Sequence, residues 1–197
     1  MSLEFNVRGI RNARPNLVFA EYRETPLYDN GKPIYHGLQA WFVNKPKTPT
    51  KDSVAEDVTA KITFYNKTTY EKLIVYGLWI ISEAFDFAGY TEANNTLSKI
   101  SPNDEPCKLA IAVKWQEDES AYAFVAESHI YSTNRDFREK TREIQKGTHY
   151  VKVEIRGVGI SQEPYWFVLT NQGENKELSL SPPIKKPNLR KEGFQIE

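Results

Sequence analysis

The 197-residue sequence contains a single cysteine, Cys107, so no disulfide forms within the chain. This excludes the disulfide-rich class of secreted proteins and the cystine of antibody-type domains, but it leaves the compartment open. No run of about 18 apolar residues is present, so we expect no membrane-spanning helix. The N-terminus also lacks the basic and then apolar order of a signal peptide. Because it starts Met1-Ser2-Leu3, we expect residues 1–14 to be a linker or an expression leader on a fragment.

Neither sign of charge is in excess, because 26 basic side chains balance 26 acidic ones. A protein that binds nucleic acid usually carries a basic surplus, since neutralising phosphates supplies most of its affinity. The sequence therefore predicts no nucleic-acid partner.

Motifs that carry catalysis are also missing. None of the three histidines, His36, His129 and His149, has a second histidine or a cysteine at the spacing of a zinc site. There is no glycine-rich phosphate loop and no Gly-x-Ser-x-Gly nucleophile motif. We expect Cys107 to be an inert cysteine at the start of a strand. The sequence thus predicts no catalytic residue, no metal site and no cofactor.

Aromatic residues are abundant, at 13%, and many of them alternate with valine, isoleucine and threonine. Such side chains fit a pleated, half-buried surface. In one segment Val58, Ala60, Ile62 and Phe64 point one way and the intervening residues point the other, as in an antiparallel sheet covered on one side. Strands are predicted at 17–22, 38–43, 58–65, 72–79, 108–115, 122–126, 151–156, 165–169 and 177–180.

Turn signals separate these strands. The strongest is Asp29-Asn30-Gly31-Lys32-Pro33, where Asn-Gly supplies the positive φ angles of a tight reversal. We predict an all-β fold, an antiparallel sandwich of about seven to nine strands over residues 15–181, with long loops at 82–96 and 127–147. Within the second loop Thr133 and Asp136 fit a capping box, so residues 132–146 form either a loop or a short helix.

Residues 182–197 form a tail that is rich in proline and lysine and has no strand or helix pattern. We expect this tail to be extended and loosely attached, with Phe194 and Ile196 tying its end to the body. It lacks the PxxP spacing of the usual proline-rich ligands.

Two segments resemble immunoglobulin-like and fibronectin-III-like domains, over about residues 35–180. Gln145–Ile155 resembles a late strand in which a turn glycine precedes a tyrosine, whose hydroxyl bonds the backbone a few residues upstream. The family spacing puts that tyrosine at His149, while Tyr150 falls on the other face. Trp41-Phe42-Val43-Asn44, then a loop and Ala55–Phe64, is similar to the opening of adhesion-type immunoglobulin-like domains of bacterial and archaeal proteins. The resemblance implies an immunoglobulin-like sandwich used in binding or scaffolding, often attached to a larger or membrane-anchored protein.

The aromatic residues also offer candidate binding sites. Trp41 and Tyr65 lie on the polar phases of their strands, which makes them the best candidates for exposed aromatics in a binding surface, unless a loop covers them. Aromatic faces suit sugar rings, although side chains of this size also fill cores. Trp115 is in phase with the apolar residues of its strand, so we expect it to point inward.

Our leading hypothesis is a non-catalytic interaction or scaffolding module, with a protein partner or the missing part of a larger chain as its ligand. In one form of this hypothesis, the chain is the soluble part of a membrane-associated protein. The alternatives are a carbohydrate-binding module that uses Trp41 and Tyr65, and an enzyme whose site is assembled from distant loops. The sequence leaves the ligand, the oligomeric state and the compartment open.

Overall fold

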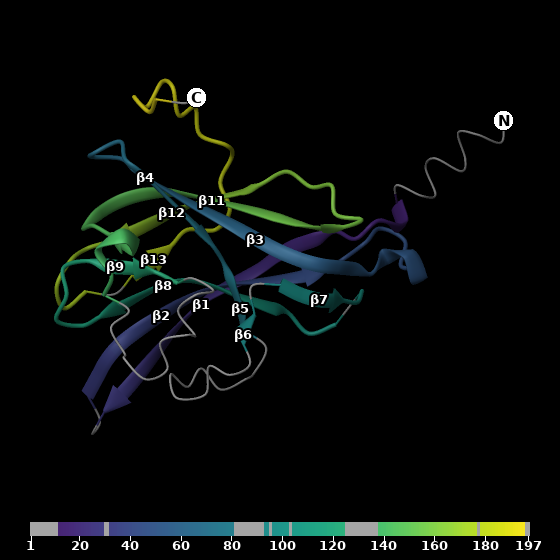
Figure 1. The fold of residues 1–197 in the computed structure, drawn as a ribbon, viewed down its shortest axis with the longest axis horizontal. Coiled ribbons are helices and arrows are strands. Elements are labelled where there is room, and N and C mark those ends of the chain that lie inside the picture. The colour runs from purple at the N-terminus through teal and green to yellow at the C-terminus, as the bar shows by residue number, and fades with distance from the viewer. Residues whose placement is uncertain are drawn as a thin grey trace.

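The computed structural model describes residues 12–29, 32–80, 93–94, 96–102, 104–124, 138–176 and 178–195 (Figure 1). These residues form two antiparallel sheets that pack face to face. The predicted all-β sandwich is therefore confirmed. In the described part no helix is long and apolar enough to cross a membrane.

The first sheet has seven strands. Its main path is β1 (Leu17–Asp29), β2 (Lys32–Asn44), β8 (Cys107–Trp115), β5 (Leu78–Ile80) and β6 (Ala93–Asn94). Beyond that path β9 (Ala121–Ala123) pairs with β8, and β10 (Glu143–Ile144) pairs with β9. Asp29 pairs with Lys32, so the chain reverses at the predicted turn between β1 and β2.

The second sheet has six strands. Its path is β13 (Leu178–Leu180), β12 (Tyr165–Asn171), β11 (Gly147–Val158), β3 (Ala55–Asn66) and β4 (Lys72–Tyr76). The other half of β3 pairs with β7 (Thr96–Ile100) on the same side as β4. A 3₁₀ turn, η1 (Lys51–Ser53), precedes β3 and is capped by the Thr50 side chain.

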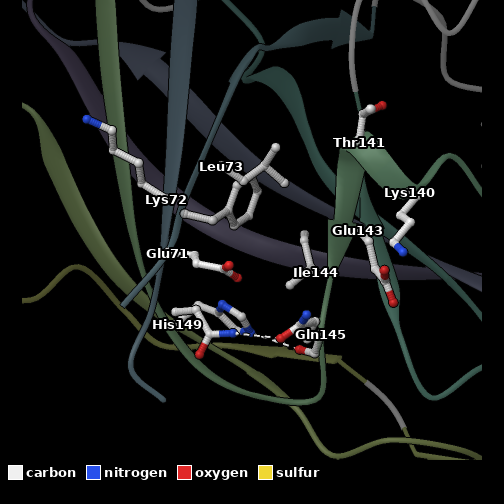
Figure 2. A pocket seen from close by; sticks show the side chains of 11 residues that line it. Glu71, Lys72, Leu73, Lys140, Thr141, Glu143, Ile144, Gln145 and His149 are labelled. Carbon is white, nitrogen blue, oxygen red and sulfur yellow. Dashed lines mark hydrogen bonds between the residues drawn. The ribbon is translucent and has the colours of Figure 1, made fainter. Parts of the chain in front are cut away.

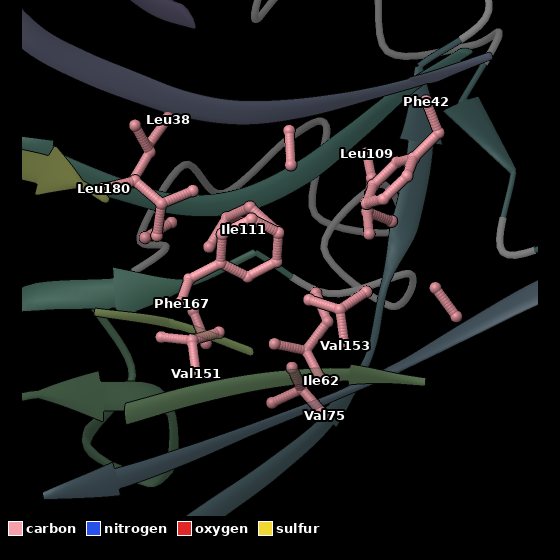
Figure 3. Close-up of a cluster of buried hydrophobic side chains, with 14 of the residues drawn as sticks. Leu38, Phe42, Ile62, Val75, Leu109, Ile111, Val151, Val153, Phe167 and Leu180 are labelled. Atoms are coloured by element: carbon pink, nitrogen blue, oxygen red, sulfur yellow. The ribbon is translucent and has the colours of Figure 1, made fainter. Parts of the chain in front are cut away.

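The core lies between the two sheets. Its side chains alternate along the strands with outward-facing residues, as the sequence pattern predicts for segment 58–65. Figure 3 shows Leu38 and Phe42 of the first sheet above Val151 and Phe167 of the second. Burying an aliphatic or aromatic side chain of this size stabilises the fold by about 1.5–3 kcal/mol.

The predicted strand at 72–79 is in fact two strands that belong to different sheets, with Gly77 between them. The Gly77 N–H donates to the Ala60 carbonyl at 2.8 Å, the last contact with β3 before the chain crosses to β8. A Cβ at position 77 would lie 2.8 Å from Cδ1 of Leu109. It would also lie 3.2 Å from Cδ1 of Ile62, so a larger residue at this crossing would have to displace side chains of both sheets.

A β-bulge in β8 reverses which residues face the core. Leu38 pairs with Ala112 but Gln39 pairs with Ala110, so Ile111 is the extra residue. Because one extra residue shifts a period of two, Lys114 points inward and Trp115 outward. The prediction that Trp115 points inward is therefore wrong. It lies half-buried on the outer face, where Arg138 and Tyr122 contact its ring.

Lys114 links the two sheets at one end of the sandwich. Its side chain is only 1% exposed, and Nζ donates to the carbonyls of Gly173 and, at 2.7 Å, of Lys176. Both carbonyls belong to the connection between β12 and β13 in the second sheet. Burial lowers the pKa of Lys114, and the nearby carboxylates of Asp118 and Glu24 oppose that change.

We predict that Lys114→Ala lowers the free energy of unfolding by about 2–5 kcal/mol. Each carbonyl left without a donor in the interior costs about 1–3 kcal/mol. Lys108→Ala is the matched control on the same strand, since Lys108 only lies over the Trp41 ring at 5.1 Å and such a contact is worth about 0.5–1 kcal/mol. Urea titration measures both values. Equal losses in the two variants would contradict the bridging role of Lys114.

The region predicted as a loop or short helix contains no α-helix between residues 138 and 146. It forms a 3₁₀ turn, η4 (Lys140–Arg142), followed directly by β10. Of the two predicted long loops, residues 82–92, 95 and 127–137 lie outside the described residues. The described end of the first loop is not a loop, because Ala93–Asn94 form β6 and Thr96 begins β7.

The C-terminal segment 181–195 runs over the outer face of the second sheet (Figure 1). Ile184 N–H donates to the Trp166 carbonyl at 2.7 Å, and Leu189 and Phe194 are buried against Trp166 and Tyr150. The expected anchoring by Phe194 is confirmed. The segment is nevertheless attached along its length rather than loosely, because β11 and β12 supply an outer apolar cluster for it. Ile196 lies outside the described residues.

Candidate functional site

The edges of the two sheets are where this sandwich can accept another chain, because an edge strand carries unpaired N–H and C=O groups. β1 is the long edge of the first sheet. Two register shifts and Pro26 interrupt it, and the ion pair of Arg23 with Glu21, at 2.7 Å, covers it with charge. Bulges, prolines and charges are the usual means of blocking an edge. We therefore do not expect β1 to accept a strand.

The remaining edges, with one exception, are short or polar. Among the described strands β6 and β10 have two residues each and β13 has three. Pro182 and Pro183 follow β13 closely, and β7 exposes Ser98 and Lys99. The exception is β4, whose outer side carries Ile74, 45% exposed, and Tyr76, 61% exposed.

The backbone of β4 is also oriented for pairing. Asn66 N–H donates to Glu71 O at 3.0 Å, and Gly77 N–H to Ala60 O at 2.8 Å. These two bonds set the phase of the antiparallel ladder, in which alternate residues bond the neighbouring strand. The N–H and C=O groups of Lys72, Ile74 and Tyr76 consequently point away from β3. No strand in the described part of the chain pairs with that side of β4.

The turn before β4 is held by Asn66. Its Oδ1 accepts from the N–H groups of Thr68, at 2.8 Å, and Thr69, at 3.2 Å. Tyr70 follows with φ of 60°, a conformation that bulky residues rarely adopt, and its ring contacts Phe194 edge-on. Tyr70, Ile74 and Tyr76 are three of the five large hydrophobic residues exposed in the described ranges. The β3–β4 hairpin thus concentrates exposed apolar surface.

A groove of about 470 Å³ runs beside β4, between this strand and β10. Figure 2 shows Leu73 and Ile144 facing each other across it, with Lys72 pointing to the other side of β4. Phe64 contributes to the apolar part of the lining. Charged and polar side chains form the rest of the lining: Asn66, Glu71, Lys72, Lys140, Thr141, Glu143, Gln145 and His149. An extended segment laid along β4 would place every second side chain over this groove.

His149 closes the inner end of the groove. His149 is buried, and its Nε2 lies 2.9 Å from the Gln145 carbonyl oxygen. Because a carbonyl only accepts, Nε2 carries the proton and donates this bond. Burial lowers the pKa of His149, although the bond to the carbonyl opposes the change. The ring is therefore neutral at pH 7. Among the described residues no group of three or more His, Cys, Asp and Glu side chains is placed to hold a metal ion.

We predict that the protein loses stability on acidification through His149. Because its pKa is lower in the folded state than the unfolded value of about 6.5, the unfolded chain binds the proton first as pH falls. The free energy of unfolding should thus fall from about pH 7.5 downward until the folded-state pKa is passed. His149→Gln should flatten this fall in urea titrations at several pH values. A fall that persists unchanged in His149→Gln would refute the assignment.

The two residues predicted from sequence as a binding surface lie on opposite faces of the sandwich. Trp41 is on the outer face of the first sheet, with the Arg23 guanidinium carbon 3.9 Å from its ring centroid. Tyr65 is on the outer face of the second sheet, where its ring stacks on Trp166 at 5.7 Å and meets Phe194 edge-on. The structure does not bring Trp41 and Tyr65 together.

Two further groups could be reactive: the thiol of Cys107 and the carboxylates of the acidic turn Glu117-Asp118-Glu119, which follows β8. Burial, together with the charge of Asp104, raises the pKa of the Cys107 thiol to about 11, so the thiol stays protonated and is a poor nucleophile at neutral pH. In the acidic turn Arg138 contacts both Glu117 and Asp118, and hydrogen bonding to its own backbone lowers the pKa of Glu117. These carboxylates are engaged in ion pairs.

Comparison of the chain with protein families, with curated proteins and with solved structures found no match. No activity is therefore carried over from a relative. Sequence reasoning missed Ile74 and Tyr76, which the geometry singles out. The sequence did contain a signal, because Leu73-Ile74-Val75-Tyr76 has no polar residue on either phase of the strand. If one face of such a strand packs on the core, the other face exposes apolar side chains to solvent.

Proposed function

We propose that this protein is a non-catalytic interaction module that accepts an extended segment of a protein partner along β4. One observation carries the proposal: β4 directs outward the backbone groups of Lys72, Ile74 and Tyr76, which no described strand pairs with, and the side chains of the same residues are exposed. Adding a strand to an exposed sheet edge is a recurrent mode of peptide recognition.

Recognition would divide between backbone and side chains. The N–H and C=O groups of β4 would bond the incoming backbone, which supplies affinity with little regard to sequence. Side chains that point inward would lie over the apolar part of the groove, beside Leu73 and Ile144. Side chains that point outward would pack on Ile74 and Tyr76. The preferred ligand is therefore an extended segment with apolar residues on both phases. Near Glu71 it would carry a basic residue, and near Lys140 an acidic one.

We also propose that the module is of the immunoglobulin-like adhesion type. Two packed antiparallel sheets support this relationship, and so does the corner at the start of β11. There the His149 imidazole bonds the backbone four residues upstream, as the tyrosine hydroxyl of that family does. Tyr150 instead packs in the outer cluster under the C-terminal segment.

The proposal is tested by selecting peptides from a random displayed library against the intact protein, immobilised sparsely so that copies do not meet. Enriched peptides should be extended and apolar, and Ile74→Lys should weaken their binding by about tenfold or more, since 1.4 kcal/mol of lost contact corresponds to tenfold. Isothermal titration with synthetic peptides measures the affinities.

Val158→Lys is the matched control, because Val158 is also an exposed aliphatic residue on a strand, 58% exposed, but it lies at the end of β11. It should leave the peptide affinities unchanged. Peptides that bind wild type and Ile74→Lys equally, or a library that yields no β4-dependent binder, would contradict the proposed function.

A further inference from the structure

We infer that one occupant of the β4 edge is a second copy of this chain, joined through antiparallel pairing of β4 with β4. This inference rests on the proposed function, because it names a partner for the same edge. Its basis is that the strand is complementary to itself in hydrogen bonding, in side chains and in charge.

Hydrogen bonding fixes the register of such a pair. With a two-fold axis at Ile74, Ile74 lies opposite the partner's Ile74, and Lys72 lies opposite the partner's Tyr76. All of these residues direct N–H and C=O outward, so each outward group finds a partner across the axis. A shift by one residue would oppose outward groups to inward ones, and a shift by two would leave one end of the strand unpaired. One register therefore satisfies the whole edge.

The side chains fit the same register. Lys72 and Tyr76 are both exposed, and their cross-strand pairing places an ammonium group beside an aromatic ring on each side of the axis. Ile74 meets the partner's Ile74 between them. On the inner face Leu73 lies beside the partner's Val75, which extends the apolar layer past the groove. No like charges face each other along the strand.

The charge of the whole chain does not oppose this association. The formal net charge is +0 at pH 7, so two copies approach without overall repulsion. The isologous contact closes on itself, because each copy uses the same edge once, and the second sheets of two copies would form one continuous sheet. Growth into a fibre is not expected, since β13 at the opposite edge of that sheet has only three residues and is followed by two prolines.

The test is sedimentation velocity of the full chain over a range of concentrations. The wild type should pass from the chain mass of 22.7 kDa toward twice that mass as concentration rises. Ile74→Lys should remain at the chain mass, because it places two ammonium groups opposite each other on the axis. Val158→Lys should associate as the wild type does. Circular dichroism and thermal melting establish that Ile74→Lys is folded.

A charge swap tests the two-fold axis itself. Ile74→Lys and Ile74→Glu should each be monomeric alone and should associate when mixed, because only the mixture places opposite charges at position 74. A wild type that stays monomeric at every concentration would overturn the inference. So would a dimer that Ile74→Lys leaves intact, or a mixture of the two variants that fails to associate.

These outcomes are separable from those of the proposed function. A monomeric wild type whose selected peptides still depend on Ile74 overturns the second copy and leaves the interaction module standing. A wild type that neither dimerises nor yields β4-dependent peptides overturns both.

Discussion

A β-sheet must end, and at its last strand the backbone N–H and C=O groups have no neighbour. Each edge strand of this sandwich therefore needs a feature that prevents unwanted pairing with another chain. Bulges, Pro26 and an ion pair interrupt β1, prolines follow the short strand β13, and the C-terminal segment covers much of the outer face of the second sheet. Among the described edge strands, β4 carries two large apolar side chains in the open, Ile74 and Tyr76, on residues whose backbone groups point outward. The candidate site is thus the edge that the fold leaves open.

Two local irregularities, the crossing at Gly77 and the bulge at Ile111, determine how the two sheets are connected. Gly77 lets the chain cross from the second sheet to the first, so that β4 ends where β5 begins. The bulge at Ile111 turns Lys114 inward, and its bonds to Gly173 and Lys176 join the sheets at one end. Because the sheets are held together by the core and by Lys114, the β4 edge can remain unpaired without loosening the sandwich.

Sequence reasoning predicted the all-β sandwich, because alternation such as that of Val58 to Phe64 reports a half-buried strand directly. It failed for Trp115, since a one-residue bulge shifts every later side chain to the other face and leaves no mark in the alternation itself. Strands of two residues, such as β10, have no period to detect. The site was missed for a related reason: an apolar segment such as Leu73 to Tyr76 indicates burial, and only the sheet order reveals that β4 has an open edge.

The most direct test of an open β4 edge is residue-resolved amide hydrogen exchange of the dilute, monomeric protein by NMR. The N–H groups of Leu73 and Val75 point toward β3 and should be protected, whereas those of Lys72, Ile74 and Tyr76 should exchange rapidly. Protection at these three positions should then appear when a strand occupies the edge. Equal and strong protection of all five amides in the monomer would contradict the account, because it would mean that β4 is already paired on both sides.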